Sequence, residues 1–491
     1  MKQGLPSSGQ GGPELVALLK TGMRLQKGGR LGEAEECYRQ ALDLHPGNGR
    51  ALHLLGLLSQ QAGNMEAAEA FFLDALASEN NEPFYHVSLG VLLARTGRER
   101  DATQCFERAL ELSPGNVHAR YQLANALHRL GELDDALRSY EKARILDPDN
   151  AVLLVHMGSA LNALGKTGKA IELYRRAIQL DPQRAAAYGN LGNALAVEER
   201  YDEAIAAFDR CIELQPENPT TYANLGSCYL QRGDWKQAQA AYRETLARAP
   251  GDITALAMQA AIHNELGEHN SRDVILDYER LVSLRPIDTP DRYGSVEAFN
   301  QELKKLVLSH RSLEYEPHSH TTRLGQQTGN LLDAGEPVFD LLGSIIRDRI
   351  RSYLNEYESE SGATWQRPVP DHWRLDMWAT VLHQGGHQIP HIHPSGWLSG
   401  VYYVACPFEQ ADPGMRGWLE FGEPPANFPF KEPASKMILE PSEGLLVLFP
   451  SYFYHRTIPF DDDRPRISIA FDMAPARAAF SEVRTSQGPV G

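Results

Sequence analysis

The sequence lacks the features that mark disulfide-rich, membrane-spanning and secreted proteins. Its five cysteines form no CxxC pair, and all but Cys406 fall within a repeated pattern, where small buried residues are expected. We therefore expect reduced thiols and no disulfide framework. No segment reaches the roughly 18 uninterrupted apolar residues that a membrane span needs, and the opening MKQGLPSSGQGGPE has no apolar stretch typical of a signal peptide. These absences favour a soluble cytoplasmic protein without a membrane partner.

Positive charge is also in short supply. The 491 residues include 48 lysines and arginines against 64 aspartates and glutamates, a formal net charge of −16, and no Lys/Arg-rich block offsets this excess. Nucleic acid is therefore not an expected partner, because a polyanion binds to basic surfaces. Neither a GxSxG elbow nor a Gly-rich phosphate loop is present. The length exceeds that of one domain, which is usually about 100 to 200 residues, so at least two domains are expected.

A 34-residue period runs through the first half of the chain. Small residues at fixed positions let two helices approach closely, and a proline ends the second helix because it has no N–H to donate. The recurring residues are Gly22, Gly56, Gly90, Ala124, Gly158, Gly192 and Gly226, then Ala34, Ala68, Ala102, Ala136, Ala170, Ala204 and Ala238, and Pro46, Pro114, Pro148, Pro182, Pro216 and Pro250. The pattern resembles the tetratricopeptide repeat. It predicts seven helix pairs over about 15–252 and a degenerate eighth repeat up to Pro286.

The first helix of each pair would line the concave face of this solenoid, where extended partners bind. Residues three apart on a helix share a face, and mostly uncharged polar side chains occupy that face here. Those predicted to contact a protein or peptide partner are Gln122, Asn125, His156, Asn190, Asn193 and Asn224. Amides can bond a peptide backbone of any sequence, and Asn190 and Asn224 resemble the asparagine ladder of O-linked N-acetylglucosamine transferase. The alternative is that these residues only satisfy the repeat consensus and solvate the groove.

The composition changes after Pro286. Two segments, 299–308 and 338–357, carry apolar residues at helical spacing. Short β-rich runs broken by Gly and Pro follow at 375–382, 399–406, 417–422, 436–441, 444–450 and 466–473. Strands at this spacing after two helices predict a sandwich or barrel with helical support. We therefore expect a flexible N-terminus (1–14), an all-α repeat solenoid (15–286), an α+β domain (287–475) and a flexible tail (476–491).

The stretch HIHPSGWLSGVYYV places two histidines one residue apart. On a strand, His391 and His393 would point to the same side. Imidazole nitrogen suits borderline metals such as iron, and an iron(II) oxygenase site has three protein ligands on one face. His455, in the turn after the run GLLVLFP, is the expected third ligand. Zinc held by three histidines and a water, with hydrolytic chemistry, is an alternative.

Two further residues suggest an anion site. Arg466 and Ser468 would share one face of the last strand, where a guanidinium fork and a hydroxyl can receive a carboxylate. Either Tyr402 or Tyr403 can add a phenolic donor. The alternative is that Arg466 pairs with the acidic turn at 461–463.

The order of HxH, SGVYYV, LFPSYFYH and RISIAFD, with the earlier QQTGNLL, resembles the 2-oxoglutarate and iron(II) dependent oxygenases, in particular a hydroxylase branch of bacteria and phages. The resemblance covers about 290–475. It implies a double-stranded β-helix (jelly-roll) fold, with Fe(II) bound by His391, His393 and His455. It also implies molecular oxygen as oxidant and 2-oxoglutarate as cosubstrate, bound by Arg466 and Ser468 and touched by Tyr402.

One position departs from the pattern, because most of the superfamily has Asp or Glu where this chain has His393. Three neutral imidazoles leave the full +2 charge on the iron, whereas two imidazoles and a carboxylate leave +1.

Taken together, the sequence predicts a cytoplasmic dioxygenase that hydroxylates a protein or peptide captured by the repeat arm. One alternative is a non-catalytic scaffold or a sensor of 2-oxoglutarate or metal that recruits partners through its repeats. Another is a small-molecule hydroxylase whose repeats serve assembly. No oligomeric state is predicted.

Overall fold

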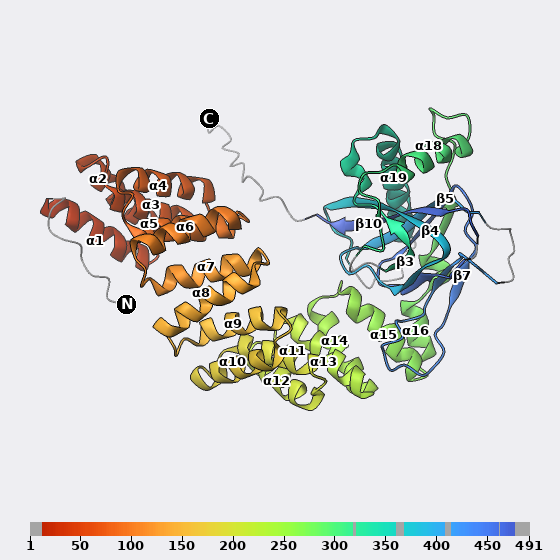
Figure 1. Ribbon diagram of the computed structural model, residues 1–491, viewed down its shortest axis with the longest axis horizontal. Coiled ribbons are helices and arrows are strands. Elements are labelled where there is room, and N and C mark those ends of the chain that lie inside the picture. Colours follow the sequence, from red (N-terminus) through yellow and green to blue (C-terminus); the bar gives the residue numbers. More distant parts are fainter. Residues whose placement is uncertain (1–11, 318–320, 360–367, 408–413, 461, 477–491) are drawn as a thin grey trace. The chain divides into compact units, whose positions relative to one another are not determined.

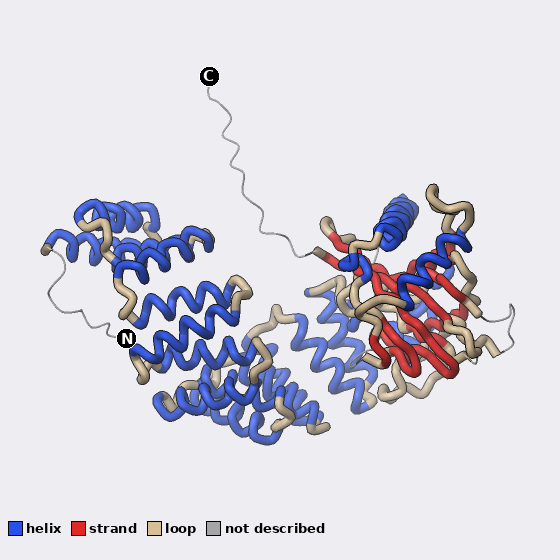
Figure 2. Tube along the Cα trace, turned by 45° about the horizontal axis from the view of Figure 1, so that its top comes forward, coloured by secondary structure: helices blue, strands red, loops and turns tan. Residues whose placement is uncertain are grey.

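The structure, a computed structural model, describes residues 12–317, 321–359, 368–407, 414–460 and 462–476. The chain divides into two units, residues 1–214 and 215–491. In the described part of the first unit the regular elements are all helices, whereas the strands, red in Figure 2, all lie in the second unit. None of the helices in the described ranges combines the length and the hydropathy needed to cross a bilayer.

The first unit is a series of helix pairs, each joined by a short turn (Figure 1). Asparagines before α3, α7 and α9 cap these helices, since each side chain accepts a hydrogen bond from a backbone N–H three residues later. The helices are α1 (Pro13–Lys27), α2 (Leu31–Leu44), α3 (Gly49–Gln61), α4 (Met65–Ser78), α5 (Pro83–Arg95), α6 (Glu99–Leu112), α7 (Val117–Arg129), α8 (Leu133–Leu146), α9 (Ala151–Ala163), α10 (Thr167–Leu180), α11 (Ala185–Val197) and α12 (Tyr201–Leu214).

The glycines of the 34-residue period mark close helix packing. A Cβ atom at Gly56 would lie 2.5 Å from the ring of Phe72, and one at Gly90 would lie 2.6 Å from the ring of Phe106. Each glycine therefore makes room for an aromatic residue of the second helix. The alanines of the period, such as Ala68, are fully buried in the same cores. The predicted solenoid is confirmed by this packing.

The polar residues predicted to contact a partner differ in exposure. Asn193 is exposed, whereas Gln122, His156, Asn190 and Asn224 are half-buried. For these residues, partner contact stays a prediction.

Asn125 belongs to the packing of its own helix pair. It is buried, and its Oδ1 accepts a 2.6 Å hydrogen bond from the hydroxyl of Tyr140 on α8. This bond gives Asn125 a structural role that the repeat pattern did not indicate.

His53 on α3 is a buried titratable residue of the first unit. Its ring packs against Phe72 and Tyr85, and its Nε2 lies 2.8 Å from Ser88 Oγ. Burial lowers the pKa of His53 to about 4, with Arg50 acting in the same direction. The ordinary value is about 6.5, so between pH 6.5 and 4 the unfolded chain binds more protons, and stability falls as the pH falls.

We expect protonation of His53 to lower the free energy of unfolding by up to about 3 kcal/mol between pH 7 and pH 4. His53→Gln should lose that part of the pH dependence. Urea unfolding followed by circular dichroism, from pH 7 to pH 4, compares the two proteins. Equal pH dependence in both would contradict the assignment.

The second unit begins with further repeat helices and continues into the sheet. Its helices are α13 (Pro219–Arg232), α14 (Trp235–Arg248), α15 (Ile253–Glu265), α16 (His269–Ile275), α17 (Tyr278–Leu281), α18 (Val296–Leu308), the short 3-10 helix η1 (Leu331–Ala334) and α19 (Pro337–Ser359). In the eighth repeat, α16 is only 7 residues long, against 14 for α14. The prediction of a degenerate last repeat fits this shortened helix.

The strands of the described residues form one curled antiparallel sheet in the order β1-β8-β5-β10-β4-β9-β6-β7, with β3 also on β4 and β2 on β3. The strands are β1 (Ser283–Pro286), β2 (Glu314–Tyr315), β3 (Thr322–Gln327), β4 (Trp373–His391), β5 (Leu398–Ala405), β6 (Leu419–Phe421), β7 (Met437–Leu439), β8 (Leu445–Pro450), β9 (His455–Thr457) and β10 (Arg466–Pro475). This arrangement is the predicted jelly-roll type of fold.

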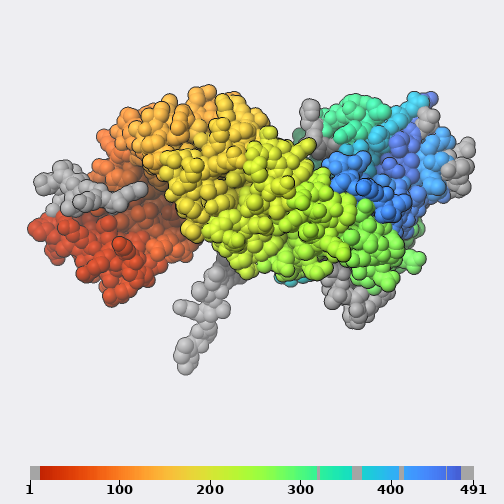
Figure 3. Space-filling view, turned by 90° about the horizontal axis from the view of Figure 1, so that it is seen from below, coloured from red at the N-terminus to blue at the C-terminus, as the bar shows by residue number. Residues whose placement is uncertain are grey.

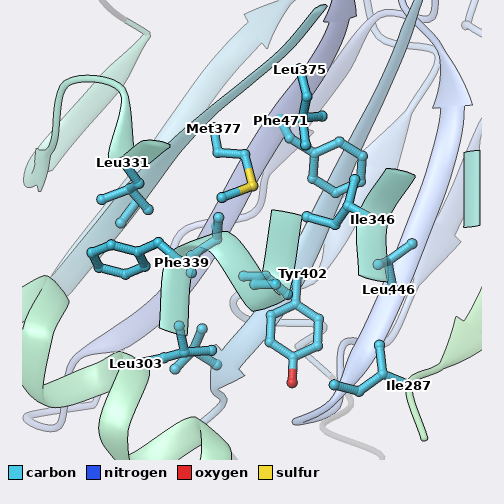
Figure 4. Packing of buried hydrophobic residues seen from close by; sticks show 14 of the residues in the cluster. Ile287, Leu303, Leu331, Phe339, Ile346, Leu375, Met377, Tyr402, Leu446 and Phe471 are labelled. Atoms are coloured by element: carbon cyan, nitrogen blue, oxygen red, sulfur yellow. The ribbon is translucent and has the colours of Figure 1, made fainter. Parts of the chain in front are cut away.

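Helices cover two sides of the sheet. On one side, α18 and α19 bury Leu303, Phe339 and Ile346 against strand residues such as Met377 and Phe471 (Figure 4). On the other side, the repeat helices α13 to α17 share a continuous hydrophobic core with β5, β6 and β8. In Figure 3 the yellow-green surface of these helices borders the blue surface of the strands.

Hydrogen bonds also tie the last repeats to the sheet. The hydroxyl of Tyr452 donates to the Ile275 carbonyl at 3.0 Å, and Asn264 Nδ2 donates to the Pro433 carbonyl at 2.9 Å. The repeats beyond residue 214 therefore pack as part of the second unit. The change of architecture falls between α17 and β1, slightly before the expected boundary at 286/287, because β1 pairs with β8.

Candidate metal centre

Three histidines converge at one end of the sheet. His391 ends β4 and His455 begins β9, and the two are direct partners across the antiparallel ladder. The ring centroids of His391 and His455 lie 4.2 Å apart. The ring centroid of His393 lies 5.1 Å from that of His391 and 5.0 Å from that of His455. One possible ligand atom of each histidine lies within 4.8 Å of those of the other two. This spacing lets all three bind a single ion.

His393 reaches this cluster in a different way from the one predicted. The strand ends at His391, so alternation along a strand does not align the two side chains. Instead, the backbone N–H of His393 donates to the Ser451 carbonyl at 3.0 Å, which holds the loop against the turn before β9. The rings of His391 and His393 are nearly parallel, with an interplanar angle of 20°.

Backbone carbonyls orient two of the rings. Nδ1 of His391 lies 2.8 Å from the Ile389 carbonyl, and Nδ1 of His455 lies 2.9 Å from the Phe453 carbonyl. A carbonyl only accepts, so each Nδ1 carries the proton and each Nε2 lone pair remains for a metal. Burial lowers the pKa of both imidazoles, and the neighbouring histidines act in the same direction. Both rings are therefore neutral, as metal binding requires.

A carboxylate orients the third ring. Nδ1 of His393 lies 2.6 Å from Asp472 Oδ1, and the same oxygen accepts a 2.6 Å bond from Ser399 Oγ. The Ser399 and Ser451 hydroxyls lie 2.8 Å apart. Sequence reasoning missed Asp472, although its place six residues after Arg466 puts it on the same face of β10.

An ion pair anchors the short strand that carries His455. Arg456 bonds Glu420 through Nε at 2.8 Å and Nη2 at 3.1 Å, across the pair of strands β9 and β6. The Glu420 side chain is only 5% exposed. This bidentate ion pair helps to fix the register of β9, which is only three residues long.

The three histidines line a cavity of about 360 Å³. β10 contributes Arg466, Ser468 and Asp472 to its wall, β5 contributes Tyr403, and Trp378 and Phe449 add aromatic surface. The cavity therefore brings together the predicted metal ligands and the predicted anion site.

Arg466 is a buried guanidinium in this wall, only 1% exposed. Its Nε donates to the Gly417 carbonyl at 3.0 Å and its Nη1 to Ser468 Oγ at 3.2 Å. Its Cζ lies 5.2 Å from the centroid of the Tyr403 ring. None of these contacts neutralises the charge, and a buried charge is costly without a counter-ion. The geometry therefore suits an anion bound beside Arg466.

The acidic turn does not provide that counter-ion within the described residues. Asp462 pairs with Arg464, whose Nη2 lies 2.9 Å from its Oδ2. No acidic side chain of the described ranges forms an ion pair with Arg466. Position 461 of the predicted turn lies outside those ranges.

A row of hydroxyl residues crosses the sheet beside Arg466. Ser468 on β10 is the direct partner of Thr380 on β4 and of Tyr403 on β5. Thr380 Oγ1 and the Tyr403 hydroxyl are buried and lack a hydrogen-bond partner among the described residues. Burial raises the pKa of Tyr403 despite the opposing charge of Arg466, so its phenol stays protonated and can donate. Unpaired buried donors of this kind are rare unless a ligand satisfies them.

Residues 376–472 match the sequence profile of a family described as "Putative 2OG-Fe(II) oxygenase". The first half matches repeat profiles: "Tetratricopeptide repeat" at 87–151 and 183–251, "TPR repeat" at 158–196, and "Cilia and flagella-associated protein 70 middle TPR-like domain" at 19–113. The chain joins tetratricopeptide repeats to a domain of this oxygenase family. The predicted fusion is thereby confirmed.

Several solved structures are similar to the repeat part of the chain. MamA is 26% identical, covering 33% of this chain and 94% of its own, with a TM-score of 0.31. YrrB, described as a TPR protein with an unusual peptide-binding site, is 23% identical, with coverages of 38% and 95% and a TM-score of 0.33. A tetratricopeptide repeat protein from Parabacteroides merdae is 15% identical, with coverages of 50% and 98% and a TM-score of 0.42. No curated protein matches the sequence.

In the oxygenase domain, the prediction that Tyr402 touches the cosubstrate is wrong. Successive strand residues face opposite sides, and Tyr402 points into the core beneath α18, where Figure 4 shows it near Leu303. Its hydroxyl donates to Asn300 Oδ1 at 2.6 Å. Tyr403, the other tyrosine that the sequence offers as a donor, is the one that lines the cavity.

Proposed function

We propose that the protein is a cytoplasmic 2-oxoglutarate- and iron(II)-dependent dioxygenase that hydroxylates a protein or peptide. The observation that carries this proposal is that three converging imidazoles and a buried, unneutralised guanidinium line the same cavity. Imidazole nitrogens suit iron. A guanidinium flanked by unpaired hydroxyls suits a carboxylate such as the far end of 2-oxoglutarate. The residues present therefore fit both groups.

In this proposal His391, His393 and His455 hold the iron through Nε2. Iron(II) with 2-oxoglutarate and dioxygen supplies the oxidative decarboxylation of the cosubstrate and the hydroxylation of a substrate C–H bond. Arg466 and Ser468 orient the far carboxylate by charge-assisted hydrogen bonds. The protein contributes this positioning and an aromatic wall that limits access of water.

The repeats support a polypeptide substrate over a small molecule. Solenoids of this type present an extended concave surface that suits peptide segments. Half-buried or exposed amides, including Asn190 and Asn193, can bond a peptide backbone there. The last repeats share a hydrophobic core with the sheet of the oxygenase domain, so this part of the solenoid is held against the catalytic domain.

Release of succinate from 2-oxoglutarate in the presence of iron(II) tests this function. We expect slow release by the protein alone and faster release when peptides from a cell lysate are added. Metal binding without any succinate would instead support the scaffold or sensor. Stimulation only by the small-molecule fraction of the lysate would support a small-molecule hydroxylase.

Adjacent tyrosines give a matched test of the cosubstrate pocket. Tyr403→Phe removes an unpaired buried donor that lines the cavity, so the 2-oxoglutarate concentration for half-maximal succinate release should rise roughly 10-fold or more, the effect of losing one hydrogen bond to a carboxylate. Tyr402→Phe removes a bond to Asn300 in the core and should leave that concentration unchanged. The reverse ranking would show that the cosubstrate does not lie beside Tyr403.

A further inference from the structure

We propose that Asp472 supplies the negative charge of the metal centre, acting through His393, and that it sets the orientation of the His393 ring. Asp472 is thus a positioning residue and not a ligand. The inference rests on the proposed function in one respect, namely that the three histidines bind a divalent metal ion.

The position of Asp472 is well defined. Its Oδ1 accepts the Nδ1–H of His393 and the hydroxyl of Ser399, each at 2.6 Å. The side chains of His393 and Asp472 are only 11% and 14% exposed, so little water competes for this bond. Bonds of this length between a charged acceptor and an N–H or O–H donor are of the strong, charge-assisted type.

The surroundings leave space for this carboxylate. A Cβ atom at Gly396 would lie 2.7 Å from Ser451 Oγ and 3.1 Å from Asp472 Cγ. The Gly396 N–H also donates to the His393 carbonyl at 3.0 Å, which closes a tight turn after the histidine. Any side chain at position 396 would therefore push on the group that holds His393.

His393 also needs such support more than its two neighbours. His391 and His455 belong to paired strands, and backbone carbonyls fix their rings. His393 lies beyond the end of β4, and its ring nitrogen finds a side-chain carboxylate instead of a carbonyl. Of the three ligands, it is the one whose orientation depends on an ionisable partner.

Charge gives the second argument. Three neutral imidazoles would leave the full +2 charge of the ion in a partly buried cavity, where an uncompensated charge is unfavourable. A carboxylate one imidazole away offsets that charge and makes Nε2 of His393 a stronger donor. Loss of such an outer partner typically weakens metal affinity by about 10- to 100-fold.

The experiment compares metal affinities of the full chain without 2-oxoglutarate or substrate. Asp472→Asn keeps the shape and an accepting oxygen but removes the charge. Anaerobic competition with a chelator for Fe(II), and for Co(II) with its visible spectrum recorded, should show affinity lower by about 10- to 100-fold and a shifted Co(II) spectrum. Asp348→Asn, the same change at an exposed residue on α19, should alter neither.

A second pair of variants separates positioning from folding. In a His393→Asp background the carboxylate binds the metal directly, so adding Asp472→Asn should cause no further loss of affinity. An equal loss in both backgrounds would overturn the proposal, because Asp472 would then act through the fold. Unchanged affinity and spectrum of the single variant would also overturn it while leaving the proposed function standing. A wild-type protein that binds neither metal would overturn both.

Discussion

His455→Ala should abolish stoichiometric iron binding. His455 is buried, neutral and fixed by the Phe453 carbonyl, and its ring faces those of His391 and His393. Losing one of three ligands should weaken affinity by more than about 100-fold, beyond the effect expected for an outer partner. Anaerobic titration with Fe(II) measures this loss, and His391→Ala should behave in the same way.

Two controls accompany this prediction. His383→Ala removes an exposed histidine of the same strand as His391, one that contacts Gln326, and should bind iron normally. Helix content should be unchanged in all variants, because the first unit has hydrophobic cores of its own. Full iron binding by His455→Ala would show that iron does not bind at the three-histidine cluster.

Arg466→Ala should leave iron binding intact and raise the requirement for 2-oxoglutarate. A hydrogen bond to a charged group contributes about 1.5 to 3 kcal/mol, which corresponds to roughly 10- to 150-fold in the concentration needed. Succinate release measured against 2-oxoglutarate concentration gives this number, with Fe(II) affinity determined in parallel.

Arg464→Ala is the matched control, since it removes an exposed arginine two residues earlier on the chain, one that pairs with Asp462. It should change neither property. An unchanged 2-oxoglutarate requirement in Arg466→Ala would mean that the buried guanidinium serves only to hold the Gly417 carbonyl and the Tyr403 ring.

The repeats could be predicted because the same helix–helix packing contacts recur every 34 residues and require the same small residues each time. Gly56 and Gly90 are glycines since the rings of Phe72 and Phe106 leave no space for a Cβ atom. Local contacts of this kind repeat at a fixed interval and so are readable from one sequence.

The strand boundaries were harder to predict where pairing with a distant strand, and not the local residue pattern, decides where a strand begins or ends. β4 runs on to His391 through a segment with two glycines and a proline, which had suggested that the strand ends at 382. β9 has only three residues, too few to show a strand pattern in the sequence, although its ladder contact with β4 places His455 opposite His391. Such pairings depend on partners distant in sequence.

The site shows the same limit. The histidines and Arg466 were found from motif order. Asp472, in the cavity wall, and Thr380, the partner of Ser468, were missed because only the register of β4 and β10 brings them to the site. The choice between Tyr402 and Tyr403 depended on which face of β5 is covered by α18. A chain of alternating residues does not reveal which of its two faces is the core.

A crystal structure of the full chain grown anaerobically with Fe(II) and 2-oxoglutarate, with anomalous scattering recorded at the iron edge, tests the central claim most directly. We expect one iron peak bonded to Nε2 of His391, His393 and His455, with a carboxylate of 2-oxoglutarate against Arg466. An iron peak elsewhere, or 2-oxoglutarate bound away from Arg466, would contradict it.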